Sequence, residues 1–158
     1  MCNAGVIWGD MFEQQARLFA CDCAERVLPI FESEYPNEHR PRQALATARR
    51  FAKNEATAKE VRASRVDAAV IVCREIGGGT IAETIEILAA RTALGSIGWV
   101  TADGISARCI EGATEAARKA IELSVLAKTE DLSRAKDAAN AERVWQKAQL
   151  QRYINDKT

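Results

Sequence analysis

The sequence has no excess of charge of either sign, no long apolar stretch and only one histidine, His39. Its 22 basic and 22 acidic side chains balance, which argues against a dedicated nucleic-acid binder, because such proteins carry a basic excess. No window approaches the roughly 18 uncharged apolar residues that a membrane span needs. The first residues also lack the basic start, the apolar stretch and the cleavage site of a secretion signal. We therefore expect a soluble, cytoplasmic protein.

The cysteines do not form a recognisable disulfide framework. An odd number without regular spacing fits a reducing compartment; the five are Cys2, Cys21, Cys23, Cys73 and Cys109. On a helix, Cys21 and Cys23 project roughly 200° apart, whereas structural zinc sites use C-x₂₋₄-C and a second ligand pair. We favour small buried hydrophobes for these two thiols, with no cofactor. A metal-binding, ligand-binding or enzymatic site built from Cys21, Cys23 and His39 is the alternative.

Proline and aromatic residues are also few, whereas alanine occupies 29 of the 158 positions. Abundant alanine with few β-branched runs favours helices. The periodicity of apolar residues and the capping residues predict helices over about 10–28, 42–54, 57–75, 80–94, 105–126 and 132–154. We therefore predict an all-α fold: a compact, alanine-rich bundle of five to six helices with no sheet. Residues 1–158 form a single domain in this prediction, and any sub-boundary falls at the Gly77–Gly79 hinge.

Local signals predict where these helices begin, end and approach one another. Thr57 and Glu60 have the spacing of a capping box. Pro41 suits the first turn of the second helix, and the residues 129–131, which end at Asp131, cap the last helix. Pro29 breaks or kinks the first helix, and residues 30–34 should form another turn or two. Gly95 and Gly98 bracket the end of the fourth helix. Gly112 either weakens the fifth helix, at a cost of about 1 kcal/mol relative to alanine, or permits a close contact between helices.

Charge neutrality conceals a local separation of charge. The first segment and the loop after it are acidic, and the helix that follows is basic. Seven residues of this region are our candidates for contact with a partner: Asp22, Glu25, Glu32, Glu34, Glu38, Arg40 and Arg42. Such an acidic patch could imitate nucleic acid or meet a basic partner. Surface solvation and pairing between helices is the competing interpretation.

Three motifs resemble segments of a known protein family. They are FACDCAERVL at 19–28 and RPRQALATAR at 40–49, both within a similar run over 19–61, and AERVWQ at 141–146, within a similar segment over 141–150. Similar segments occur in a family of small, all-helical bacterial and phage-encoded proteins, some of which are described as immunity proteins of bacterial toxins. The middle of the chain departs from that family, because it has Ile, Val and glycine where the family has long alanine-rich repeats.

The resemblance implies a non-catalytic protein that binds another protein, either a toxin or a host defence factor, and inhibits it. It supplies no catalytic residues. Besides the metal or ligand site, a second alternative stays open, that of a structural homo-oligomer. In that case Gly95, Gly98, Trp99 and the apolar face over 68–73 form the self-association surface.

Overall fold

The computed structural model describes residues 13–71, 85–101 and 107–156. Over these residues the chain forms helices and no strand. The helices are α2 (Glu13–Glu34), α3 (Arg40–Ala52), α4 (Ala58–Ile71), α5 (Ile85–Val100), α6 (Ala107–Thr129) and α7 (Leu132–Asn155). The predicted all-α fold is confirmed. None of these helices is long and apolar enough to cross a membrane. The Gly77–Gly79 hinge, Cys2 and Cys73 lie outside the described residues.

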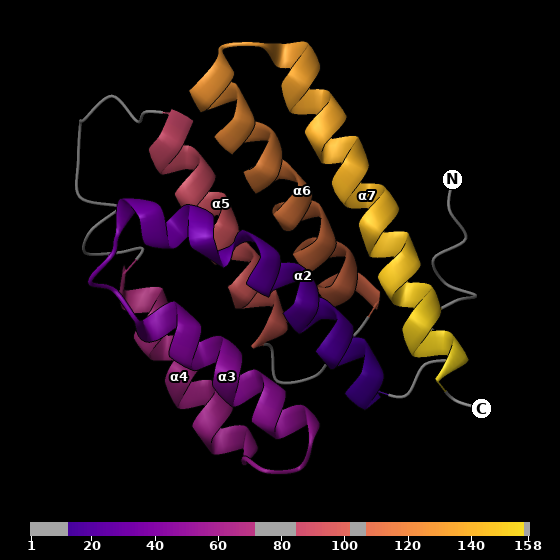
Figure 1. The fold of residues 1–158 in the computed structure, drawn as a ribbon. Helices are drawn as coiled ribbons and strands as arrows, with labels where there is room; N and C mark the ends of the chain where they lie inside the picture. Colours follow the sequence, from indigo (N-terminus) through magenta and orange to yellow (C-terminus); the bar gives the residue numbers. More distant parts are fainter. Residues whose placement is uncertain (1–12, 72–84, 102–106, 157–158) are drawn as a thin grey trace.

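Helices α5, α6 and α7 lie side by side in chain order, and α2 crosses over α5 and α6 (Figure 1). Helices α3 and α4 pack together, with α3 against α2. Helix α4 is the most peripheral of the six, since it packs mainly on α3 and touches α5 at few residues. The outer side of α4 is therefore left without a covering helix in the described part of the chain.

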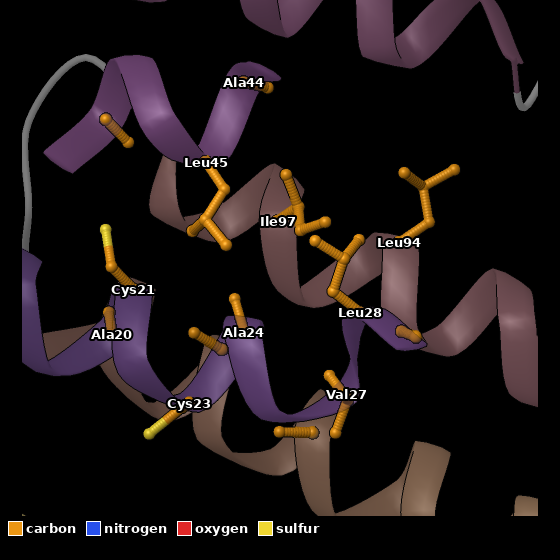
Figure 2. Packing of buried hydrophobic residues seen from close by; sticks show 14 of the residues in the cluster. Ala20, Cys21, Cys23, Ala24, Val27, Leu28, Ala44, Leu45, Leu94 and Ile97 are labelled. Carbon is orange, nitrogen blue, oxygen red and sulfur yellow. The ribbon is translucent and has the colours of Figure 1, made fainter. Parts of the chain in front are cut away.

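The core is centred on α2, which is enclosed by α3, α5, α6 and α7. Its Phe19, Val27, Leu28 and Phe31 are fully buried (Figure 2 shows Val27 and Leu28 among their neighbours). The surrounding helices meet α2 largely through alanines, which are Ala44, Ala48, Ala90, Ala93, Ala113, Ala117 and Ala120. The distance between two packed helices depends on the side chains at their contact. Alanine in these positions therefore lets several helices approach α2 closely.

Local sequence signals predicted several helix starts correctly. The backbone amide of Thr57 donates to Glu60 Oε2 at 2.7 Å, and the Glu60 amide donates to Thr57 Oγ1 at 3.3 Å, which is the predicted capping box. Pro41 lies in the first turn of α3, where a missing N–H costs nothing. At the start of α7, Asp131 Oδ1 accepts hydrogen bonds from the amides two and three residues further on, at 2.9 and 3.2 Å.

Replacing Asp131 with alanine should lower the free energy of unfolding by about 1 kcal/mol, because two amides at the start of α7 would lose their acceptor. Asn at this position should retain most of the stability, since its side-chain oxygen can accept the same hydrogen bonds. Urea denaturation followed by circular dichroism would measure both variants. Equal loss in the Asn and Ala variants would contradict a capping role.

Of the two outcomes expected at Pro29, a break of the helix is wrong, and the helical turns expected over 30–34 are confirmed. Helix α2 continues through Pro29 to Glu34. Pro29 is exposed, while Leu28 and Phe31 on either side of it are fully buried. Burial of these neighbours holds the helix together, because most helix stability in proteins comes from packing of the apolar face.

The predicted helix end at Gly95 and Gly98 is also wrong. Both glycines lie inside α5, which continues to Val100. Leu94 and Ile97 are buried in the core, so packing again outweighs the weak local preference against helix. By contrast, the alternative of a close contact at Gly112 is confirmed, because a Cβ atom built there would lie 2.5 Å from Cε2 of Trp99.

The run 68–73 is apolar almost all round, a pattern that predicts a helix end deep in the core, but it is less buried than this pattern predicts. Ala68 is buried, but Ala69, the next residue, is exposed. Residues 72 and 73 lie outside the described residues. The expectation that the end of α4 lies deep in the core is therefore wrong at Ala69. The physical reason is that α4 is peripheral and has a neighbour mainly on one side.

Candidate functional site

The acidic segment and the basic helix predicted from the sequence face each other in the structure. Arg42 on α3 makes a two-point contact with Glu32 on α2, with Nε to Oε1 at 2.6 Å and Nη2 to Oε2 at 2.7 Å. Arg40, the first residue of α3, donates from Nε to Oε1 of Glu38 in the preceding loop, at 2.7 Å. These arginine hydrogen bonds are the main reason why the pKa values of Glu32 and Glu38 lie below their usual range. Both carboxylates therefore stay ionised far below neutral pH.

Asp22 joins three helices. Its Oδ1 lies 2.8 Å from Arg49 Nη1 on α3, while its Oδ2 accepts hydrogen bonds from Gln149 Nε2 at 2.8 Å and Tyr153 Oη at 2.7 Å on α7. Burial, followed by the hydrogen bond to Asp22, raises the pKa of the Tyr153 hydroxyl. The hydroxyl therefore stays protonated and continues to donate throughout the neutral range.

Six of the seven candidate partner-facing residues thus have ion pairs within the chain. The sixth is Glu25, which also pairs with Arg49. The seventh, Glu34, is exposed at the end of α2. Asp22, Glu25, Glu32 and Arg42 lie along the seam between α2 and α3, where their ion pairs join the two helices. Glu38 and Arg40 pair with each other at the start of α3. Their contact with a partner stays a prediction.

Cys21 and Cys23 are both fully buried in α2. Figure 2 shows that they point to different sides of the helix, and each side is covered because α2 is central. Burial raises the pKa of Cys21 to about 12 and also raises that of Cys23. His39, by contrast, is exposed where α3 begins. Across residues 13–71, 85–101 and 107–156, no three His, Cys, Asp or Glu side chains are grouped as metal ligands.

Cys21 and Cys23 should resist alkylation in the folded protein at about pH 8, because the thiolate is the reactive form and both thiols are buried with raised pKa values. Treatment with iodoacetamide followed by trypsin places both residues in the peptide 18–26, whose mass reports their modification. Complete labelling in guanidinium is the control. Labelling of the native protein at the rate of an exposed thiol would contradict this assignment.

The first and last family-like motifs contact each other, a contact that the sequence did not predict. Arg26 Nε on α2 donates to both carboxylate oxygens of Glu142 on α7, at 3.2 and 2.9 Å. The same guanidinium lies 4.0 Å from the ring centre of Trp145, and Gln146 Nε2 donates to the backbone oxygen of Thr114 on α6 at 3.0 Å. The conspicuous side chains of the AERVWQ motif therefore attach α7 to α2 and α6. No local signal could reveal this, because Arg26 and Glu142 are 116 positions apart.

A groove of about 340 Å³ lies between the peripheral helix α4 and helix α5. We refer to it as the α4–α5 groove; its lining residues are Arg65, Ala68, Ala69, Leu94, Gly95, Ile97, Gly98 and Thr101. Several belong to the surface that the sequence suggested for self-association. The sequence did not show that this part of the chain is concave, and self-association through it stays a prediction.

These features define a small helical-bundle protein whose charged clusters and cysteines serve mainly to pack its helices. The chain belongs to the Imm-5 like putative immunity protein family, which it matches over residues 9–153. The resemblance noted for residues 19–61 and 141–150 is therefore confirmed and extends across the middle of the chain. No curated protein and no solved structure matches the chain.

Proposed function

We propose that this protein is a non-catalytic inhibitor that protects its cell by binding a toxin protein. The family match over residues 9–153 carries the proposal. The family description names immunity, and immunity to a protein toxin requires recognition of that toxin. A host defence factor as the target, which the sequence left open, has no comparable support.

The site geometry supports binding rather than catalysis. Nucleophilic catalysis needs an activated thiol or hydroxyl next to a base. Cys21 and Cys23 are buried with raised pKa values, whereas His39 is exposed at the start of α3. The ion pairs along the seam between α2 and α3 join helices, so they too have a packing role.

Co-expression with a candidate toxin tests the proposal. Immunity genes are expected beside the toxin genes that they counteract, so the toxin to test is the neighbouring gene product that arrests growth when induced alone. We expect co-expression of this chain to restore growth. A truncated chain with a stop codon before α7, which cannot form the complete bundle, controls for expression load. Continued arrest in the presence of folded, abundant protein would overturn the proposal.

A titration separates inhibition by binding from an enzymatic mechanism. An inhibitor that binds one-to-one abolishes toxin activity only when its concentration reaches that of the toxin. An enzyme that modifies or degrades the toxin would act well below equal concentration and its effect would grow with time. We expect the first pattern, measured with purified toxin and purified inhibitor at concentrations above their dissociation constant.

A further inference from the structure

The α4–α5 groove has a buried apolar floor and an open surface. Leu94 and Ile97 of α5 and Ala68 of α4 form part of the hydrophobic core below it. Ala69 and Gly98 are exposed at its surface. A segment placed in the groove would therefore contact apolar atoms that the bundle already holds rigidly.

Gly95 and Gly98 are unusual in this setting. Each lies inside α5, where glycine destabilises a helix relative to alanine. A Cβ atom built on either glycine would meet nothing within 4 Å. No close packing within the described part of the chain therefore calls for their small size, in contrast to Gly112 beneath Trp99. Two glycines at i and i+3 do, however, let a second helix approach the backbone of α5 closely, as small residues do at other helix crossings.

We propose that the α4–α5 groove is the docking site for an acidic amphipathic helix of the protein that this chain inhibits, an inference that rests on the proposed function. Recognition of a helix in an apolar groove is an established mode, in which apolar side chains at helical spacing serve as anchors. The exposed backbone at Gly95 and Gly98 receives the apolar face of the incoming helix.

The charge at the groove favours an acidic occupant. Arg65 lines the groove and is exposed, and no carboxylate of the described residues pairs with it. Asp67, two positions further along α4, projects roughly 200° away. A second copy of this chain docked on the same groove would therefore bring arginines together without a carboxylate between them. A partner with a glutamate or aspartate at the edge of its helix would complete the ion pair.

Two exposed apolar side chains are sequence neighbours of residues that line the groove. Val66 on α4 is 62% exposed and lies next to Arg65, and Trp99 on α5 is 38% exposed and follows Gly98. They are two of the four large hydrophobic side chains that are exposed in the described residues; the others are Leu132 and Val144 on α7. Neither side chain lines the groove; Val66 lies beside it on α4, whereas Trp99 packs over Gly112 of α6.

A peptide titration tests the groove without the toxin. The probe is an amphipathic peptide of about 18 residues, or five helical turns, with leucine and alanine on one face and glutamate at its edges. Added to the ¹⁵N-labelled full chain, it should shift the amide signals of Gly95 and Gly98 and the indole signal of Trp99. A matched peptide with lysine in place of glutamate, or the Arg65→Glu variant, should weaken binding about tenfold. Equal binding of both peptides, or shifts confined to other helices, would overturn the inference.

A matched pair of valines tests the groove in cells. Val66→Asp, beside the groove, should abolish protection against the toxin, whereas Val144→Asp on α7 should leave it intact. Val144 is 69% exposed, so the two substitutions are similar in exposure and chemistry, and thermal melting of both variants checks that they fold. Loss of protection by Glu34→Lys, with full protection by Val66→Asp, would place the contact on the acidic segment instead. A chain that protects against no toxin would overturn the proposed function. The peptide titration would still show whether the α4–α5 groove binds an acidic helix.

The glycines provide a second, independent variant. Gly95→Ala should raise the melting temperature by about 2 °C, because alanine stabilises a helix interior and nothing obstructs its Cβ. Gly98→Leu should remain folded yet reduce peptide affinity about tenfold by filling the groove. Unchanged affinity in Gly98→Leu would overturn the inference. So would a concentration-dependent dimer in sedimentation that Val66→Asp abolishes, because the occupant would then be a second copy of this chain.

Discussion

Arg26→Ala is expected to lower the free energy of unfolding by about 3 kcal/mol, the lower end of the range for breaking a buried ion pair. The side chain of Glu142 is 1% exposed, whereas that of Arg26 is 42% exposed, so the substitution leaves the buried partner without its counter-charge. Trp145 also loses the cation over its ring. Because 1 kcal/mol corresponds to about 2–4 °C at this chain length, we expect the melting temperature to fall by roughly 10 °C. Circular dichroism would measure it, and a single transition would agree with the predicted single domain.

The defect of Arg26→Ala should depend on pH in a definite direction. Burial already raises the pKa of Glu142 above its usual value, against the lowering effect of Arg26. Without Arg26 the pKa of Glu142 rises further. A carboxyl whose pKa is higher in the folded than in the unfolded state stabilises the fold when protonated, and this stabilisation is lost as the pH rises through the folded pKa. The free energy of unfolding of the variant should therefore be closest to that of the wild type near pH 4.5, and the difference between them should be largest near pH 7.

Glu142→Gln supplies the control for this prediction. Combined with Arg26→Ala, it removes the buried charge and should recover a substantial part of the lost stability at neutral pH, while it abolishes the pH dependence. A loss in Arg26→Ala below about 1 kcal/mol, typical of an exposed pair, would contradict the assignment of a buried contact. So would a loss that does not change with pH.

The sequence predicted the features that depend on neighbouring residues. The capping box of Thr57 and Glu60 and the cap at Asp131 each involve groups within three positions of one another, so the spacing alone identified them. The contact of Arg26 with Glu142 could not be predicted this way. Asp22 and Arg26 are four positions apart, a spacing that allows a pair on one helix, yet in the bundle Asp22 pairs with Arg49 and Arg26 pairs with Glu142. Which charges meet is decided by how the helices pack.

The effect of proline and glycine on the helices was overestimated for a similar reason. Pro29 and the glycines of α5 weaken a helix locally, and the sequence placed a break or an end at each. In the bundle, neighbours of these residues are buried, and burial of a large aliphatic or aromatic side chain contributes about 1.5–3 kcal/mol. That exceeds the cost of about 1 kcal/mol for a glycine in a helix. The sequence pattern showed the apolar stripe, but it did not show which side of each helix would be covered.

The candidate site was predicted only in part. The separation of acidic and basic segments is real, but it produces the ion pairs of Glu32 with Arg42 and Asp22 with Arg49 between α2 and α3. The surface around Gly98 and Trp99 was noticed because small and aromatic residues stand together there. Its concave shape depends on α4 lying beside α5, and that arrangement is a property of the folded chain alone.

Gly112→Leu is expected to destabilise the protein by about 3 kcal/mol, the upper end of the cost of overpacking. A Cβ atom at Gly112 would lie 2.5 Å from Cε2, 2.6 Å from Cδ2 and 2.7 Å from Nε1 of Trp99. These atoms belong to the rigid indole, so a small rotation of a flexible chain end cannot relieve the contact. Leucine is a good helix former, so the loss would reflect displacement of Trp99 and not helix propensity.

Gly95→Leu provides the matched control for Gly112→Leu. It introduces the same side chain at a glycine inside a helix, where nothing lies within 4 Å of the new Cβ atom, so its melting temperature should equal or exceed that of the wild type. Adding Trp99→Ala to Gly112→Leu should restore much of the lost stability, because the leucine then occupies the space of the indole. Equal loss in Gly95→Leu and Gly112→Leu would show that glycine is needed at both positions for the same backbone reason, and that the close approach of Trp99 does not explain Gly112.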